Sequence, residues 1–518
     1  MRKSKYAALC MALLLTGCSS AENAPAESIP IIDAGGAAIS EGEPAQTSAG
    51  VQPPQTSLQT TARTQPEQSA EPAEAESSAE PPQPAATTAE QTTSTTSEQT
   101  SDATQISNAP QTSSTPQTTP QTTPQTTTQT SAQPADEPIV TEPDFGTNSY
   151  KALNYSEVKA VWISYIELAE LLTGQTAAGF RSAIGAAFDN CAGMGINTVY
   201  IHVRSHGDAY YKSELYPWSK YVTGTLNSAP AFDPLDIMLE EAHSRGLSLH
   251  AWINPLRACT AAQLDSYGDF PVKQWAKSDA SKYVVNVGGT YYLNPAYEQV
   301  TDFIALGAAE IAANYDVDGV HIDDYFYPTT DSSFDSSAYS ASGYSTLSAF
   351  RFANCDRLVR SIYSAVKSAN GSALFGVSCQ GSIENNYNLM YADVKKWCTE
   401  SGYLDYIAPQ IYYGFTNTAQ PYEKCLSQWN DIAKSGGIPL IAGLSVSKIG
   451  YEDKWAGSGK NEWLTASGII SRQINAAMEC TAYGGTALYS YRSIFAPESG
   501  VKSQVDAEIS AVKQIYLQ

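Results

Sequence analysis

The sequence predicts an α/β protein, a (β/α)8 TIM barrel preceded by a long disordered linker. First, short β-rich segments alternate with amphipathic helical segments eight times between residues 148 and 518. Second, that region carries nearly all of the Trp, Tyr and Phe residues. Third, residues 19–147 contain one aromatic residue, Phe145, and are rich in Thr, Gln, Ser, Pro, Ala and Glu. Such a segment cannot bury enough apolar surface to fold.

Residues 1–18 predict a lipoprotein signal peptide. Arg2, Lys3 and Lys5 precede an apolar stretch over 6–16, which is too short to span a bilayer. The sequence Leu-Thr-Gly-Cys that ends at Cys18 resembles the lipobox of bacterial lipoproteins, in which the Cys becomes the acylated amino terminus. We therefore expect an exported protein, lipid-anchored to the bacterial cell membrane through Cys18. An ordinary secretory signal with a chance Cys is the alternative.

Residues 19–147 are expected to tether the barrel to this anchor. A flexible chain of about 130 residues has a root-mean-square span of roughly 60 Å, and regular Pro and like charges extend it further. This length would let the barrel face the cell wall or the exterior. A spacer without a further function is the alternative.

The net charge of −23 limits the possible partners. The linker holds 17 acidic residues and one basic residue, and the barrel region is also acidic. An acidic domain without a basic run is a poor match for nucleic acid or for an anionic membrane surface, so neither is expected as a main partner.

Residues 148–518 are expected to form one barrel domain. The predicted strands are 158–165, 196–203, 247–253, 317–323, 373–378, 405–413, 438–444 and 486–491. The predicted helices are 177–194, 233–245, 296–314, 345–368, 391–400, 421–435, 467–481 and 502–516. The second helix shows the local signals well, since Asp233 precedes Pro234 at its start and Gly246 follows its end. A doubly wound sheet is the alternative, but eight units favour the barrel.

Polar and aromatic side chains follow the predicted strands, where barrel enzymes place their active sites. Aromatic rings pack on pyranose faces, and amides, acids and Arg bind sugar hydroxyls. The candidate substrate-binding residues are His202, Arg204, Tyr211, Trp218, Asn254, Arg257, His321, Tyr325, Gln410, Tyr412, Tyr413 and Tyr491. Arg204 and Arg257 can bind a substrate carboxylate or, equally, orient the acids. No metal or cofactor is expected, because the sequence has no CxxC pair and its only close His pair flanks a strand end.

Asp323 and Asp324 are the sharpest catalytic candidates. Strand alternation directs His321 and Asp323 into the barrel and leaves Asp324 at the rim. Glycosidic cleavage needs two carboxyl groups, and two neighbouring acids favour protonation of one of them. A loop cap or an ion pair is the alternative role for each Asp. Asp208 and Glu384 are candidates for a further catalytic acid, with a solvated loop position as the alternative.

Three motifs are similar to those of the glycoside-hydrolase-like-10 family. They are FDPLDIMLEEAHSRGLSLHAWINPLR (232–257), DGVHIDDYFYP (318–328) and APQIYYG (408–414). The family is a (β/α)8 group that includes a divisome-localised enzyme cutting peptidoglycan strands stripped of their peptides. The resemblance implies that Asp323 and Asp324 lie in the family's cleft, with Arg204, Asp208, Asn254, Arg257, Tyr325, Gln410 and Tyr412.

The sequence also departs from that family. The second strand ends in His202-Val203-Arg204-Ser205 where the family often has QVRP, and the fifth strand leads into CQGSIENN instead of a loop with Pro and Trp. Tyr325 stands where chitinase-like barrels have a catalytic Glu, which disfavours their substrate-assisted chemistry.

These observations predict a surface lipoprotein that hydrolyses glycosidic bonds in peptidoglycan or a related cell-wall glycan. The partner is then a glycan polymer. A barrel that binds glycan without cutting it, for wall attachment or adhesion, is the alternative. An exported enzyme acting on a capsular or dietary polysaccharide is a third possibility.

Overall fold

The computed structural model describes residues 143–278, 282–324, 326–465 and 467–518. The predicted signal peptide, Cys18 and nearly all of the predicted linker lie outside the described residues. Tyr325 also lies outside them.

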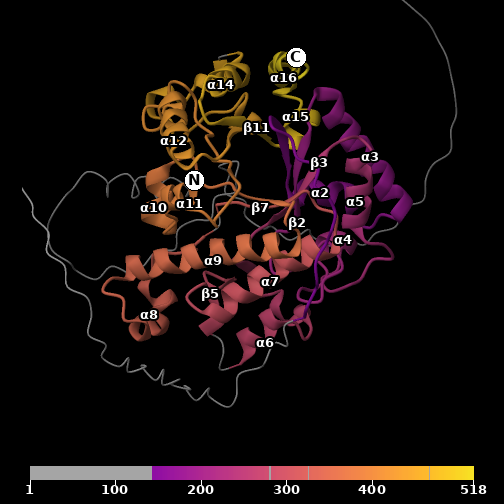
Figure 1. Cartoon of the computed structure of the whole chain (residues 1–518). Helices are drawn as coiled ribbons and strands as arrows, with labels where there is room; N and C mark the ends of the chain where they lie inside the picture. Colours follow the sequence, from indigo (N-terminus) through magenta and orange to yellow (C-terminus); the bar gives the residue numbers. More distant parts are fainter. Residues whose placement is uncertain (1–142, 279–281, 325, 466) are drawn as a thin grey trace, which may run out of the picture. The chain divides into compact units, whose positions relative to one another are not determined.

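Eight parallel strands close into a barrel, which confirms the predicted fold (Figure 1). The order around the barrel is β1-β11-β10-β9-β8-β7-β3-β2. The strands are β1 (Val158–Ile163), β2 (Thr198–Arg204), β3 (Ser248–Ile253), β7 (Gly319–Ile322), β8 (Leu374–Val377), β9 (Tyr406–Ile407), β10 (Leu440–Ser445) and β11 (Tyr483–Tyr489). Because the pairing is parallel throughout, all eight carboxyl ends open at one mouth.

The eight predicted helices are present with small changes at their ends. They are α3 (Ala177–Met194), α5 (Pro234–His243), α7 (Glu298–Asn314), α9 (Leu347–Ala369), α11 (Val394–Thr399), α12 (Tyr422–Gly436), α14 (Ile469–Met478) and α16 (Lys502–Tyr516). The Asp233 side chain accepts the backbone N–H of Leu235 at the start of α5, as its cap position predicted. Helices α7 and α9 pack side by side (Figure 1).

Short helices in the connecting segments were not predicted. They are α2 (Tyr165–Leu172), α4 (Lys220–Thr223), α6 (Pro271–Lys277), α8 (Ser336–Ser342), α10 (Ile383–Met390), α13 (Glu462–Thr465) and α15 (Tyr491–Phe495). Most of them are one or two turns long, so their apolar periodicity is too brief to detect. Among the described residues, no helix combines the length and the apolar character needed to cross a membrane.

The segment between β3 and α7 forms a small antiparallel sheet that sequence analysis missed. Its strands are β4 (Arg257–Thr260), β5 (Val284–Val287) and β6 (Thr290–Leu293), in the order β4-β6-β5. Each strand has four residues, which is short for a period-two pattern to stand out. The sheet begins at Arg257, four residues after the end of β3, and therefore lies next to the barrel mouth.

Strand β9 is shorter than the predicted 405–413 segment. Pro409 has no backbone N–H and cannot donate to a sheet ladder. Beyond it, the chain stays in place through isolated bridges from Gln410 to Gln380 and Gly443. The sixth strand position therefore presents Gln410 at the mouth without a continuous ladder.

A buried carboxyl links the loop after β2 to α7. The Glu310 side chain on α7 is fully buried. It accepts the Ser213 hydroxyl at 2.6 Å and the Glu214 backbone N–H at 2.6 Å. Burial raises the pKa of Glu310 to about 7, and these hydrogen bonds oppose the shift.

We predict that Glu310 makes stability fall as pH rises. A Glu carboxyl titrates near 4.3 in an unfolded chain, so the folded state holds its proton over a higher pH range and loses that advantage between roughly pH 4 and pH 7. Urea titrations at several pH values in this range will show that the free energy of unfolding depends less on pH for Glu310→Gln than for the native chain. The exposed Glu423→Gln serves as the control. Parallel curves for Glu310→Gln and the native chain would contradict the assignment.

Candidate active site

A hydrogen-bonded group of rings fills the barrel interior. The Trp162 indole N–H donates to Nε2 of His321 at 3.1 Å. Nδ1 of His321 lies 2.9 Å from the Tyr406 hydroxyl, which lies 2.9 Å from Nδ1 of His250. The Tyr200 ring stacks on His321 with a centroid distance of 4.2 Å. The predicted inward direction of His321 is therefore observed, but its ring is enclosed by neighbours instead of facing substrate.

Burial fixes the protonation of the two interior His residues. Desolvation lowers the pKa of His321 well below its ordinary value and that of His250 to about 4. An indole nitrogen can only donate, so Nε2 of neutral His321 accepts from Trp162 and Nδ1 carries the proton. Nδ1 of His321 therefore donates to the Tyr406 hydroxyl.

A second layer lies closer to the mouth and consists of His202, Trp252, Asn254 and Asp323. We call it the Asp323 layer. The His202 ring stacks on Trp252 with a centroid distance of 3.3 Å. The Trp252 indole N–H donates to Oδ2 of Asp323 at 3.1 Å. Nδ1 of His202 accepts the Tyr165 backbone N–H at 3.0 Å, so Nε2 donates to Oδ1 of Asn254 at 2.8 Å. Nδ2 of the buried Asn254 has no hydrogen-bond partner among the described residues, which leaves a free donor in this layer.

The two neighbouring acids occupy different environments. Asp323 is 1% exposed and is held by Trp252, whereas Asp324 is partly exposed. The Gln410 amide donates to Oδ1 of Asp324 at 3.3 Å and to the Ser378 carbonyl at 3.3 Å. Asp324 is thus the acid of the pair that solvent and a substrate can reach.

A cation and aromatic rings surround this layer. The Arg257 guanidinium lies 5.5 Å from the Tyr165 ring centre, and its Nε donates to the Ser205 carbonyl at 3.1 Å. The Tyr412 ring packs 5.8 Å from that of Tyr489, the last residue of β11. The structure therefore brings together His202, Asn254, Arg257, Asp323, Asp324, Gln410 and Tyr412 at the mouth.

Arg204 lies elsewhere because β2 contains a bulge, and Tyr211 is buried in the loop that follows β2. The register shifts between His202 and Arg204, so Arg204 pairs with Ile253 on the face that packs against the helices. The Arg204 side chain is fully buried, with its guanidinium 4.6 Å from the Tyr216 ring. Tyr211 is also fully buried, with its ring 5.6 Å from that of Tyr315. Both side chains are therefore enclosed in this structure, and their expected sugar contacts stay a prediction. Alternation along the sequence cannot reveal the bulge that redirects Arg204.

Asp208 and Trp218 lie in the loop after β2, beyond Arg257. Asp208 is 4% exposed, and burial raises its pKa to about 6, while Ser219 and nearby cations oppose the shift. Trp218 forms an isolated backbone bridge with Ala209 and is partly exposed. Arg257, which borders the Asp323 layer, is among the cations that act on Asp208.

The remaining candidates lie outside this layer. Glu384 sits on α10 and lines a separate pocket. The Tyr491 hydroxyl accepts from the Asn190 amide of α3 at 3.1 Å, which directs the ring away from the mouth. Burial, with a smaller effect of the Asp324 charge, raises the pKa of Tyr413. Helix α10 thus carries Glu384 into a pocket apart from Asp323, and its expected catalytic role stays a prediction.

Two positions important to the site were not among the predicted site residues. Trp252 follows the same alternation as His250, so its inward direction was detectable, although not its bond to Asp323. Glu167 and Ser164 form a capping box that a local pattern can show, but the other two partners of Glu167 come from the far end of the chain and were not detectable. Its carboxylate accepts the Ser164 N–H at 2.6 Å, the Ser490 hydroxyl at 2.5 Å and the Arg492 N–H at 2.8 Å. These bonds join the ends of the first and last barrel strands.

The arrangement defines a class of protein. A TIM barrel that ends its fourth strand in two acids, next to amides, an Arg and aromatic rings, has the architecture of a glycoside hydrolase. Within the described residues, no group of three or more His, Cys, Asp or Glu side chains is placed to hold a metal ion.

Residues 157–457 match the family described as Glycosyl hydrolase-like 10. The chain therefore belongs to this family, and the predicted resemblance is confirmed. It is 31% identical over 327 residues to Glycosyl hydrolase DigH of Escherichia coli (strain K12), covering 58% of this chain and 73% of DigH. It is 29% identical over 380 residues to Glycosyl hydrolase YngK of Bacillus subtilis (strain 168), covering 68% of this chain and 72% of YngK.

One solved structure that aligns with the barrel is the PgaB (BpsB) glycoside hydrolase domain from Bordetella bronchiseptica. The alignment has a TM-score of 0.41 and 11% sequence identity, and it covers 68% of this chain and 99% of that domain.

We predict that His321→Phe destabilises the barrel. The change leaves the Trp162 N–H without its acceptor and removes one partner of Tyr406, and each lost bond to a buried group costs about 1–3 kcal/mol. Urea denaturation should show a free energy of unfolding lower by roughly 2–4 kcal/mol. A change within about 0.5 kcal/mol, the range of ordinary surface substitutions, would show that the interior bonds are not needed for stability.

Proposed function

We propose that this protein is a cell-surface lipoprotein that hydrolyses glycosidic bonds in peptidoglycan or a related cell-wall glycan. The observation that carries the proposal is the acid pair at the end of β7, in which Asp323 is buried and bonded to Trp252 and Asp324 is partly exposed and bonded to Gln410. Family membership supports the reaction class. The family resemblance of the motifs and the predicted export signal support the wall glycan as substrate.

Asp324 is proposed as the acid that protonates the leaving glycosidic oxygen. A proton donor must come within hydrogen-bond reach of the scissile bond, and Asp324 is the accessible member of the pair. As the bond breaks, water adds to the anomeric carbon, and its proton passes to the Asp324 carboxylate that the first transfer leaves, which restores the acid. Asp323, fixed by Trp252, places negative charge beneath the positive charge that develops on the sugar ring.

The surrounding side chains are proposed to orient the sugar. The unpartnered Nδ2 of Asn254 can donate to a sugar oxygen, and Arg257 at the rim can bind a carboxylate. Tyr412 offers a ring for the apolar face of a pyranose. Gln410 holds Asp324 and is therefore a positioning residue.

Cys18 and the linker are proposed to place this site outside the cell membrane. An acylated Cys18 would hold the chain at the membrane, and residues 19–147 would let the barrel reach the wall.

We predict that the full chain releases soluble fragments from purified sacculi and that Asp324→Asn abolishes most of this release. Loss of a general acid typically costs about 10²–10⁴-fold in rate. Asp323→Asn should also reduce the rate, because it removes the charge held by Trp252. Chromatography of fragments from sacculi with and without stem peptides measures the outcome.

Asp506→Asn on α16 is the matched control, since it removes an exposed carboxylate paired with Lys502 and should not change the rate. The alternative of a non-catalytic barrel for wall attachment predicts a different result. Binding to sacculi that survives both site substitutions, together with no release by the native chain, would establish that alternative and reject hydrolysis.

We also predict that Cys18→Ser moves the protein out of the membrane fraction. Without the acylated thiol, no lipid holds the amino terminus. Fractionation followed by immunoblotting should find the native chain with membranes and the variant in the soluble exported fraction. Equal distribution of the two chains would reject the lipid anchor and leave the barrel's proposed reaction untouched.

A further inference from the structure

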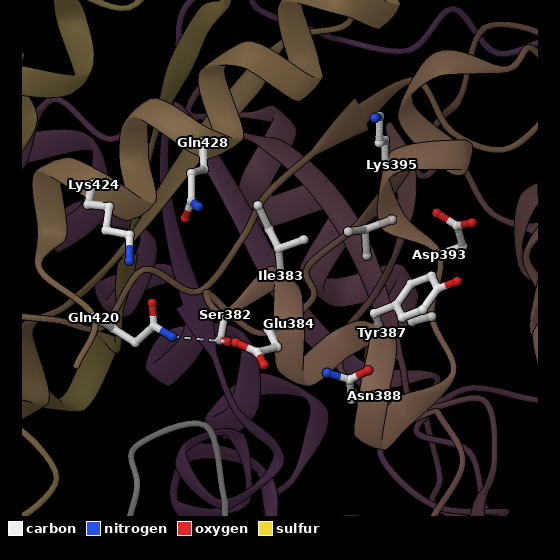
Figure 2. A pocket seen from close by; sticks show the side chains of 12 residues that line it. Ser382, Ile383, Glu384, Tyr387, Asn388, Asp393, Lys395, Gln420, Lys424 and Gln428 are labelled. Atoms are coloured by element: carbon white, nitrogen blue, oxygen red, sulfur yellow. Dashed lines mark hydrogen bonds between the residues drawn. The ribbon is translucent and has the colours of Figure 1, made fainter. Parts of the chain in front are cut away.

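A second pocket lies between α10, α11 and α12, outside the Asp323 layer. It has a volume of about 490 Å³. Its lining comes from the loop after β8, from α10, from the start of α11 and from the first half of α12 (Figure 2). The residues are Ser382, Ile383, Glu384, Tyr387, Asn388, Ala392, Asp393, Val394, Lys395, Gln420, Lys424 and Gln428. We call it the α10–α12 pocket.

The pocket holds two lysines that have no acidic partner. Lys395 on α11 and Lys424 on α12 are both exposed, and neither forms an ion pair or a side-chain hydrogen bond with a described residue. Figure 2 shows them on opposite sides of Ile383. By contrast, the adjacent Lys396 is paired with Asp356 at 2.7 Å. The lining thus carries two lysines that no acidic side chain of the described residues neutralises, beside the carboxylates of Glu384 and Asp393. A free lysine at the edge of a cavity can bind a carboxylate.

The other lining groups suit a sugar. Asn388 and Gln428 offer unengaged amides, and Gln420 donates to the Ser382 hydroxyl at 3.3 Å. The Glu384 carboxylate, with no described partner, can accept hydroxyl hydrogens, whereas the Asp393 carboxylate already caps α11. These groups match a hydroxyl-rich ring.

An aromatic ring stands at the edge of the pocket. Tyr387 is 49% exposed, and its inner side rests on Phe352 of α9 with a centroid distance of 4.3 Å. The ring is thus held in place from behind and presents its outer side to solvent. Such a ring can pack on the C–H face of a pyranose.

The pocket is close to the acid pair along the chain. The Ser378 carbonyl accepts from Gln410, which also holds Asp324, and Ser382 of the pocket is four residues further on. Four residues span at most about 14 Å. Tyr413 is near both Asp324 and Ser382, which places one side chain between the two sites. A polymer lying across the mouth can therefore reach the pocket with a neighbouring unit.

We propose that the α10–α12 pocket is a remote subsite that binds a carboxylate-bearing sugar unit of the glycan chain. The proposal rests on the proposed glycan hydrolase function and adds a substrate class to it. One of the two lysines, Lys395 or Lys424, binds the carboxylate, and Tyr387 supports the ring. Glu384, which sequence analysis assigned to catalysis, serves substrate binding here.

The test compares how the full chain and the double variant Lys395→Gln/Lys424→Gln bind and hydrolyse two glycan strands. One probe is a peptide-free strand of alternating N-acetylglucosamine and N-acetylmuramic acid, and the other is the same strand with its lactyl carboxylates reduced to alcohols. Binding is measured by calorimetry in an Asp324→Asn background, and hydrolysis is measured with Asp324 intact. The variant should bind the carboxylated strand about tenfold more weakly, with KM raised similarly, kcat unchanged and binding of the reduced strand unchanged.

Lys502→Gln/Lys513→Gln on α16 is the matched control for charge and should bind both strands as the native chain does. Equal affinity of the native chain and the Lys395/Lys424 variant for the carboxylated strand would overturn the subsite. Lysine-dependent binding without any hydrolysis by the native chain would support the subsite while rejecting the proposed reaction. Calorimetry thus separates the two failures.

Discussion

The structure depends on satisfying polar rings inside a closed barrel. Eight short parallel strands enclose Trp162, His250, His321 and Tyr406, and every donor that points inward needs an acceptor there. The hydrogen bonds from Trp162 through His321 to Tyr406 meet this need with neutral groups. Because the interior is neutral and rigid, the layer above it can hold a charged group in a fixed position, and Asp323 is that group.

The same architecture gives two adjacent acids different surroundings. Alternation turns Asp323 inward onto Trp252 and leaves Asp324 partly exposed beside Gln410. The two acids are neighbours in the sequence, and they differ in burial because successive side chains along the strand point in opposite directions. A pair built in this way offers one acid to a substrate and keeps the other beneath it, which is the division of roles that glycosidic cleavage requires.

Much of this was predictable from local patterns. Period-two alternation and helix caps gave the eight strands and helices, and the inward direction of His321 and Asp323 followed from the same rule. Most of the missed features have no local signal. The bulge in β2 turns Arg204 toward the helices, and α10 carries Glu384 into a different pocket. The hairpin of β5 and β6 did have a local signal, because the Gly288-Gly289 pair stands between two β-rich segments, but each strand has only four residues.

The most direct measurement is a crystal structure of the Asp324→Asn variant with a peptide-free glycan oligosaccharide. We predict that the oxygen of one glycosidic bond lies within about 3 Å of the residue 324 side chain, with the sugar ring above Asp323 and beside Asn254 and Tyr412. A saccharide bound away from the ends of β3, β7 and β9, or a barrel mouth closed over Asp323 and Asp324 in the complex, would contradict it.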